Sequence, residues 1–185
     1  MNIAELKTEL ERLHSASFGW ALSCCRRDYS DAEEVLQTVY LKIFEGKAVF
    51  RGESSLKTWL FAVIRKTAAT EYRRKLLRTL RLTTDTTEVE HRSTYEAPTT
   101  SFERSEVQAH FQNAMKALPK RQREALHLVF YDDLSLREAA GVMGVSIGSA
   151  RQHYERGKKK MRESLAKMEV GYGNNWGRQE NPSAV

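Results

Sequence analysis

One stretch near the C-terminus carries side chains suited to contacts with nucleic acid: Arg151, Gln152, Glu155, Arg156, Lys158 and Lys159. Arginine can donate two hydrogen bonds to a guanine edge, and glutamine pairs in a similar way with adenine. Lysine has three donors and a compact charge, which suit phosphate oxygens. Glu155 has two opposite readings, because its carboxylate could accept from a cytosine amine or repel phosphate. The stretch therefore predicts a DNA-binding surface, with the contribution of Glu155 left open.

Two short helices around a tight turn are predicted to position this surface, within residues 134–165. Ser135 and Glu138 have the spacing of a capping box, which starts the first helix. Gly144 provides the backbone freedom for the turn, and Ser146 can cap the second helix. The two alanines of the first helix are small enough to let the helices cross closely. Together these signals favour a helix-turn-helix over the alternative, an ordinary helical corner with a solvated surface.

The N-terminal half is predicted to be a small helical bundle. Apolar residues recur at helical spacing over residues 3–13, and a second amphipathic run covers residues 30–44. Ser30 and Glu33 predict a capping box at the start of the second run. Gly46 predicts its end. These two runs supply apolar faces that can pack against each other.

A loop and a further helix follow in the N-terminal half. Gly52 and a serine pair mark the loop within FRGESSLKTW, residues 50–59, and the helix resumes from the end of that stretch. Its predicted buried stripe comprises Trp59, Leu60, Val63 and Ile64. Trp59 is interpreted as a core residue rather than one that stacks on DNA. A third helical stretch begins beyond residue 110, with Pro119 at a first helical position.

Charge is distributed unevenly along a chain of 185 residues with a formal net charge of +6. Residues 1–78 contain 14 basic and 10 acidic side chains, residues 79–105 contain 3 and 5, and residues 106–185 contain 13 and 9. Two separated basic regions suit a polyanion that is contacted at two places, although solvated helix faces would have the same composition. The middle region has 11 Ser or Thr among its 27 residues, which predicts a linker. The last residues are rich in Gly and Asn and predict a frayed end.

Several classes of protein are disfavoured by what the sequence lacks. No stretch has the apolar length of a membrane span, and the N-terminus does not resemble a signal peptide, so a cytoplasmic protein is expected. Cys24 and Cys25 are adjacent and are expected to be reduced core residues rather than a redox pair. The five histidines lack metal-ligand spacing, so neither a metal nor a cofactor is expected. No catalytic constellation is recognisable, and the protein is not expected to be an enzyme.

Three stretches resemble, in order and spacing, the two domains of the extracytoplasmic-function sigma factors, a group within the sigma-70 family. They begin DAEEVLQTVYLKIF, FRGESSLKTWLF and ALPKRQREALHLVF, and the last runs into the helix-turn-helix. The resemblance implies an all-α fold of two small helical domains joined by a flexible linker. The implied boundaries are 1–78 for the N-terminal domain, 79–105 for the linker, 106–168 for the C-terminal helix-turn-helix domain and 169–185 for a disordered tail.

The resemblance also implies three functional surfaces. A clamp surface that binds core RNA polymerase comprises Asp31, Glu33, Glu34 and Gln37. A minus-ten surface that holds a flipped base and the melted promoter strand comprises Lys42, Gly46, Phe50, Val63, Lys66, Arg73 and Arg74. A minus-thirty-five surface comprises the six residues of the recognition helix, Arg151, Gln152, Glu155, Arg156, Lys158 and Lys159.

The sequence departs from the family pattern at four positions. Lys66 stands where the family usually has asparagine, and Thr70 stands where it often has aspartate. Lysine only donates, whereas an asparagine amide both donates and accepts, so the base preference at minus ten is in doubt. His153 and Glu155 replace an arginine and an apolar residue in the recognition helix.

The resemblance implies a transcription initiation factor whose partners are core polymerase, promoter DNA and an anti-sigma factor, either free or bound to a membrane. A free-standing helix-turn-helix regulator is the alternative, with the N-terminal bundle as a dimerisation or sensing domain. A DNA-modifying enzyme with a helical appendage is a third reading, disfavoured by the missing catalytic residues.

Overall fold

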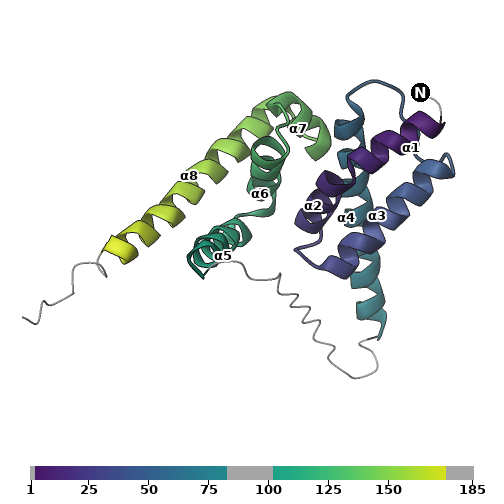
Figure 1. Cartoon of the computed structure of the whole chain (residues 1–185). Helices are drawn as coiled ribbons and strands as arrows, with labels where there is room; N and C mark the ends of the chain where they lie inside the picture. The colour runs from purple at the N-terminus through teal and green to yellow at the C-terminus, as the bar shows by residue number, and fades with distance from the viewer. Residues whose placement is uncertain (1–2, 83–101, 174–185) are drawn as a thin grey trace, which may run out of the picture.

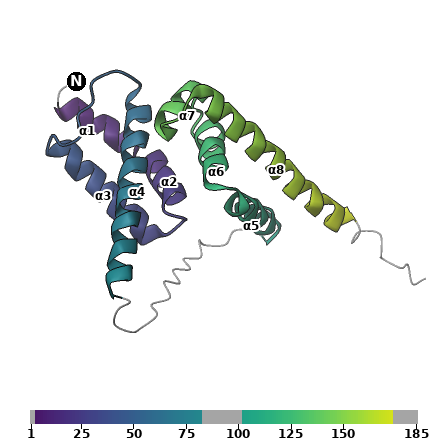
Figure 2. The same ribbon diagram turned by 180° about the vertical axis from the view of Figure 1, so that it is seen from behind.

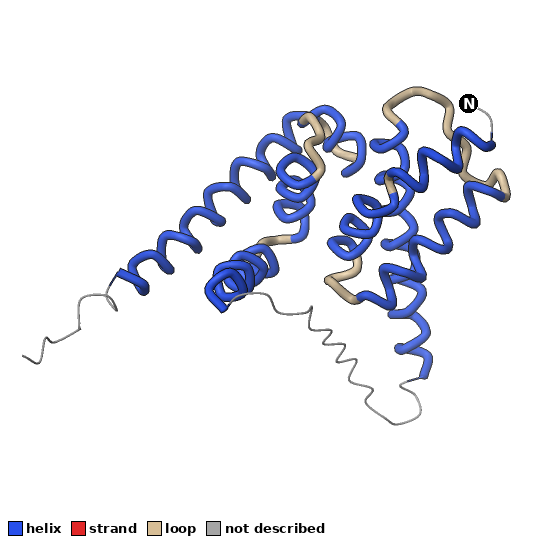
Figure 3. Tube along the Cα trace, viewed as in Figure 1, coloured by secondary structure: helices blue, strands red, loops and turns tan. Residues whose placement is uncertain are grey.

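The protein is all-helical in the part described by the computed structural model, residues 3–82 and 102–173, and no strand occurs in these two ranges (Figures 1 and 3). The N-terminal half contains α1 (Ile3–Arg12), α2 (His14–Cys24), α3 (Tyr29–Phe44) and α4 (Leu56–Leu82). The C-terminal half contains α5 (Phe102–Ala117), α6 (Lys120–Leu126), the π-helix η1 (His127–Tyr131), α7 (Leu136–Met143) and α8 (Ile147–Gly173). The predicted all-α fold of two helical parts is confirmed.

The N-terminal half is a bundle in which α2, α3 and α4 pack on one another, with α1 leading into α2 (Figure 1). Its centre is Trp20, which is fully buried, stacks on Phe61 and donates from Nε1 to the Phe61 carbonyl over 3.0 Å. Leu60 and Ile64 lie in the same core, as predicted, whereas Trp59 and Val63 are only partly buried against it. Neither the helix α2 nor the central core position of Trp20 was predicted from the sequence.

The start of α3 differs from the predicted one. Asp28 is the N-cap, and its carboxylate accepts a 2.8 Å hydrogen bond from the amide of Asp31. Ser30 therefore lies inside the first turn of the helix, and the predicted Ser30–Glu33 capping box is wrong. Aspartate and serine are about equally good caps, so the choice depended on where the preceding turn placed the chain. The predicted end is confirmed, because α3 ends at Phe44 and Gly46 follows with a φ of 71°.

The C-terminal half contains the helix-turn-helix that the sequence predicts. Ser135 and Glu138 form a reciprocal capping box at the start of α7. Gly144 ends α7 in the left-handed conformation, with φ 63° and ψ 43°. The hydroxyl of Ser146 accepts from the amide of Ser149 at the start of α8, over 3.1 Å. All three local signals are confirmed, and α7 and α8 pack on each other as a helix-turn-helix requires.

Three predicted element boundaries differ from the observed ones. Pro119 is the N-cap residue of α6 rather than its first helical residue. The predicted linker is helical at both ends, because α4 extends to Leu82 and α5 begins at Phe102. The predicted tail is helical at its start, since α8 extends to Gly173. The remainder of both segments, residues 83–101 and 174–185, lies outside the described residues, so their predicted flexibility and disorder stay predictions.

The main hydrophobic core is shared between the two halves, although the sequence indicated two small domains joined by a flexible linker. Leu128, Ala139 and Met143 of the C-terminal half belong to the same buried cluster as Trp20 and Phe61. A smaller cluster lies between α5, α6 and α8. Figures 1 and 2 both show α7 against the first part of α4, while α8 extends away from the N-terminal bundle. The described structure is therefore a closed arrangement of the two halves.

Gly157 allows the close approach of α8 to α6. A Cβ at this position would lie 3.1 Å from Leu126 Cδ1 and 3.2 Å from the Gln122 carbonyl oxygen. We predict that Gly157→Leu destabilises the protein by about 1–3 kcal/mol, because the larger side chain forces the helices apart. Gly148→Ala is the matched control, since the new methyl group would meet only Ser146 Oγ at 3.9 Å. Denaturant unfolding measures both; equal stability of the two variants would contradict the close packing.

Candidate nucleic-acid and protein interfaces

The first turns of α8 present the predicted minus-thirty-five surface to solvent. Ala150 and Gly157 are buried against the rest of the domain, so the opposite face of the helix is free. Arg151, Gln152 and Arg156 are exposed on that face. Because all three side chains leave one helix face within two turns, they can reach the base edges of one groove together.

Glu155 is also exposed, and it has a partner within α8. Its carboxylate lies 3.1 Å from Lys158 Nζ, and the same ammonium lies 5.0 Å from the centre of the Tyr154 ring. Lys159 is exposed one residue further on, 4.0 Å from the carboxylate of Glu163. The positive charge of Lys158 reduces the repulsion that Glu155 would exert on a phosphate, so the carboxylate is compatible with a DNA-facing position.

The predicted clamp surface lies along α3, and two of its four residues form ion pairs with Lys75 of α4. Lys75 of α4 forms an ion pair with Asp31 and lies 2.9 Å from the carboxylate of Glu34. Hydrogen bonding to Asp31, with a second contribution from Glu34, raises the pKa of Lys75 above its ordinary value. Glu33 and Gln37 are exposed on the same helix. The four residues thus lie together, but only Glu33 and Gln37 are free of Lys75.

The role of Lys75 was not predicted from the sequence, where it is one of 14 basic residues in positions 1–78. Lys75 and Asp31 are 44 residues apart in the chain, and no local pattern indicates that they meet. The available signal was the acidic cluster at the start of α3, which in an all-helical bundle calls for a nearby cation. The signal does not say which of the several lysines and arginines of α4 provides it.

The predicted minus-ten surface is distributed over the turn after α3 and along α4. Lys66, Arg73 and Arg74 are exposed on α4. Lys42 at the end of α3 is partly buried and donates to the Thr67 hydroxyl over 3.3 Å, so it links α3 to α4. Val63 is partly buried against the core. The structure therefore brings these residues onto neighbouring turns, with Lys42 and Val63 more enclosed than Lys66 and the two arginines.

A hollow lies beside the loop that was predicted to hold a flipped base. It has a volume of about 380 Å³ and is lined by Leu6, Ile43, Gly46, Ala48, Val49, Phe50, Arg51 and Gly52. The ring of Phe50 lies 5.4 Å from that of Trp59, which is half-buried. Gly46 and Gly52 both have positive φ angles, so the loop depends on glycine at these two turns. The hollow combines apolar walls, an aromatic ring and an arginine, the types of group that hold an unstacked base.

The adjacent cysteines pack against the shared core and are poor nucleophiles. Burial raises the pKa of the Cys24 thiol well above its ordinary value and that of Cys25 to about 12. Both cysteines are unpaired in the structure. Thiolates are the reactive form of cysteine, so these pKa values favour the core interpretation over a redox role.

Two features are absent from residues 3–82 and 102–173. None of the helices there combines the length and apolarity that crossing a membrane requires. Within the same ranges no group of three or more His, Cys, Asp or Glu side chains is placed to hold a metal ion.

Both halves of the chain match family models. Residues 10–77 match the model described as sigma-70 region 2, and residues 109–161 match sigma-70, region 4. The two matches run from the end of α1 into α4 and from the middle of α5 into α8, so they include the elements that carry the three predicted surfaces.

Individual proteins agree with the family models. The chain is 27% identical over 138 residues to the RNA polymerase sigma factor SigZ of Bacillus subtilis, covering 75% of this chain and 74% of SigZ. It is 25% identical over 130 residues to the ECF RNA polymerase sigma factor EcfG of Rhodopseudomonas palustris, covering 70% and 68%. Its fold matches the sigma factor RpoE of Bartonella quintana, solved in complex with the anti-sigma factor NepR, with a TM-score of 0.72 and 24% identity over 89% of this chain and 98% of that one.

Proposed function

The chain is an RNA polymerase sigma factor of the extracytoplasmic-function type, a member of the sigma-70 family, and on this premise we propose how its surfaces divide the work of transcription initiation. The N-terminal half binds core polymerase through α3 and holds the melted minus-ten element with the loop after α3 and with α4. The C-terminal half reads the minus-thirty-five element with α8. The observation that supports the proposal is that two separate sets of exposed basic and polar side chains lie on the two halves that match regions 2 and 4.

The contact with core polymerase is proposed to rest first on Glu33 and Gln37. Their exposed side chains are available at once, whereas Asp31 and Glu34 must exchange Lys75 for a polymerase cation. Carboxylates pair well with arginine because the two planar groups can form parallel hydrogen bonds. Replacing Lys75 by a polymerase cation has a small net free-energy cost, because each carboxylate has a cationic partner before and after the exchange.

We predict that Glu33→Lys weakens binding to core polymerase about tenfold, because a cation then faces the cations of the clamp. Titration of labelled core polymerase at two salt concentrations measures the effect. Glu11→Lys is the matched control, since Glu11 is an exposed acidic residue of α1, outside the clamp surface. Equal affinities of the two variants would remove Glu33 from the polymerase contact.

The minus-ten element is proposed to be held by the hollow and by the cations of α4. A flipped base would enter the hollow beside Phe50, and Arg73 and Arg74 would contact phosphates further along α4. Lys66 is exposed between these two sites and can donate to a base or a phosphate. A lysine there selects acceptor groups such as carbonyl oxygens or ring nitrogens, so the base preference differs from that of a sigma factor with asparagine.

An anti-sigma factor is proposed as a further partner, because the solved complex of RpoE with NepR contains a protein of the same fold. A second solved structure of this fold is CnrH in complex with the cytosolic domain of CnrY, with a TM-score of 0.60. The protein is proposed to have no catalytic activity of its own and to act only through polymerase. The free-standing regulator is disfavoured, since residues 10–77 match region 2 rather than a sensing or dimerisation domain.

A further inference from the structure

A cavity between α2 and α5, here named the α2–α5 pocket, is lined by cations. It has a volume of about 610 Å³, within the range of about 300–1,000 Å³ that is usual for small-ligand sites. Its cations are Arg26 and Arg27 of the turn after α2, Lys116 of α5 and Arg123 of α6. No aspartate or glutamate of the described ranges lines this pocket.

The four cations also lack acidic partners elsewhere. None of them forms an ion pair with a carboxylate in the described part of the chain. Arg123 instead donates to the backbone carbonyls of Lys116 and Leu118, over 3.4 Å in each case. Positive charges that surround one cavity repel one another, and an anion inside the cavity reduces this repulsion. The pocket is therefore electrostatically suited to an anionic ligand.

The turn after α2 holds two of these cations in a strained backbone conformation. Arg26 has a φ of 56° and Arg27 a φ of 67°, a region that favours glycine. Arg26 has a partner in the fold, because its guanidinium donates to the Tyr72 hydroxyl over 3.2 Å and lies 4.9 Å from the centre of that ring. The Arg27 side chain forms no hydrogen bond or ion pair within the described residues. Strain that the fold does not use is typical of ligand sites.

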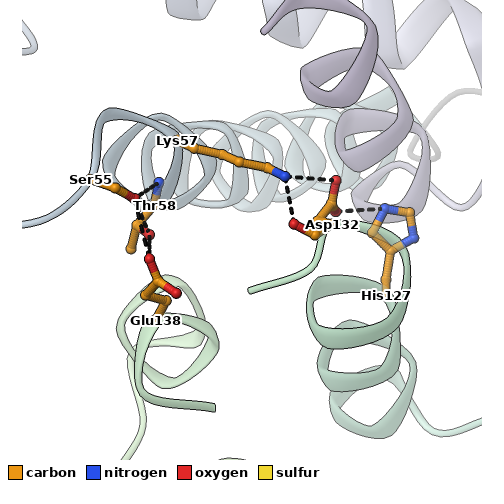
Figure 4. A network of polar contacts seen from close by, with 6 residues as sticks. All are labelled: Ser55, Lys57, Thr58, His127, Asp132 and Glu138. Atoms are coloured by element: carbon orange, nitrogen blue, oxygen red, sulfur yellow. Dashed lines mark hydrogen bonds and ion pairs between the residues drawn. The ribbon is translucent and has the colours of Figure 1, made fainter. Parts of the chain in front are cut away.

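Three aromatic rings of the C-terminal half line the same pocket: Phe111, His127 and Tyr131. The Tyr131 ring lies 5.3 Å from that of His127, at an interplanar angle of 30°, and 6.1 Å from that of Phe111. His127 Nε2 lies 3.3 Å from the carboxylate of Asp132, which Lys57 approaches from the other side (Figure 4). The His127 ring is thus held in place, and Tyr131, which is 53% exposed, has ring surface available to a ligand.

The cations and the rings face the same space. Burial raises the pKa of Tyr131, and the positive charge of Arg27 partly offsets this rise, so the guanidinium lies near the phenol. Guanidinium groups bind phosphate oxygens through parallel hydrogen bonds, and aromatic rings stack on planar bases. A ligand that is complementary to both has phosphates at one end and a planar ring at the other. Nucleotides have this composition, whereas a free phosphate would leave the rings without a partner.

We propose that the α2–α5 pocket binds a nucleotide, with its phosphates on Arg27, Lys116 and Arg123 and its base against Tyr131. The inference goes beyond the proposed function, because neither polymerase binding nor promoter recognition requires a small ligand. It assigns the protein a small-molecule site that none of the three predicted surfaces includes.

Isothermal titration calorimetry of the full-length protein, free of nucleic acid, tests the pocket with ATP, GTP, pyrophosphate and adenosine. The buffer contains EDTA and about 0.15 M salt, which screens weak attraction to the protein surface. We expect ATP or GTP to bind with a Kd below about 0.1 mM, and pyrophosphate and adenosine to bind at least about tenfold more weakly. Absence of nucleotide binding would overturn the proposal. Pyrophosphate that binds as tightly as the nucleotides would also overturn it, because the pocket would then be a general anion site.

Arg27→Gly tests where the nucleotide binds. We expect about tenfold weaker binding, because one charged contact with the phosphates is lost. We also expect no fall in Tm, since glycine adopts the left-handed conformation without strain. Arg137→Gln is the control, because Arg137 is an exposed arginine of α7 that does not line the pocket. An Arg27→Gly variant that binds nucleotide as tightly as the wild type would overturn the assignment of the pocket.

Tyr131→Leu tests the contact with the base. The variant should bind ATP and GTP only about as tightly as pyrophosphate, because the stacking surface is lost while the cations remain. Phe130→Leu is the matched control, since Phe130 is the neighbouring aromatic residue, is 68% exposed and does not line the pocket. It should keep the preference of the wild type for nucleotides. The same preference in Tyr131→Leu would contradict the proposed position of the base.

Discussion

Replacing both Arg151 and Arg156 by alanine is expected to reduce transcription from promoters with a minus-thirty-five element by roughly 30-fold to 20,000-fold at limiting sigma factor. Each arginine that contacts a guanine with two hydrogen bonds contributes about 1–3 kcal/mol of discrimination, and separated positions add approximately. Both side chains are exposed on the face of α8 opposite the buried Ala150 and Gly157, so their removal leaves the fold intact.

Run-off transcription on matched templates measures this effect. One template carries both promoter elements, and the other has a scrambled upstream element. On the scrambled template the double variant and the wild type should give nearly equal amounts of transcript, because the double variant has lost only the upstream contacts. Arg12→Ala is the control, since Arg12 is an exposed residue of α1 that pairs with Glu9. A double variant that still distinguishes the two templates as the wild type does would remove α8 from upstream recognition.

Replacing Trp20 by alanine is expected to destabilise the protein by about 3–5 kcal/mol. The indole is fully buried, stacks on Phe61 at a centroid distance of 5.9 Å and lies 5.3 Å from the His127 ring of the C-terminal half. Its removal leaves a large cavity where the two halves share their core. It also leaves the Phe61 carbonyl without the hydrogen bond from the indole nitrogen.

Thermal unfolding checks this prediction, with an expected fall in Tm of about 6–20 °C for a chain of this length. Trp59→Ala is the matched control, because Trp59 is a tryptophan of the same half that is only partly buried, and it should cost less. Equal costs for the two substitutions would show that the shared core is not centred on Trp20.

The helix-turn-helix could be predicted because its determinants are local. Ser135, Glu138, Gly144 and Ser146 each act within three or four residues of their own position, and each does in the structure what its residue type favours. The outward face of α8 then follows from helical geometry alone. Consistency between caps, turn and helix face is what made this part of the sequence decisive.

The second helix was missed because it lacks an amphipathic pattern. His14–Cys24 consists mostly of small and apolar residues on all sides, and a helix of this kind is recognised by its burial rather than by periodicity. The cap of α3 was misplaced because Asp28 and Ser30 are both competent caps only two residues apart. Which of the two residues caps the helix depends on the conformation of the preceding turn, and the local sequence does not specify that conformation.

The contacts between the halves could not be predicted from sequence at all. Lys57 and Asp132 are 75 residues apart, and Thr58 and Glu138 are 80 apart. In the sequence Lys57 is one of many cations and Asp132 belongs to an ordinary acidic pair in a loop. The packing role of Gly157 could not be predicted either. In the sequence, a glycine inside a helix indicates only lower helix stability, and its role becomes clear once the neighbouring helix is seen to approach it closely.

Run-off transcription with sigma-free bacterial core polymerase tests the central claim most directly. The templates form a library with randomised upstream and downstream elements and spacers, transcribed with and without this protein. A sigma factor of this kind should produce specific transcripts only when it is present, and their start sites should lie downstream of two enriched elements. If no transcript depends on the protein while the protein alone protects a discrete duplex site, it acts as a free-standing regulator and the account given for its N-terminal half is wrong.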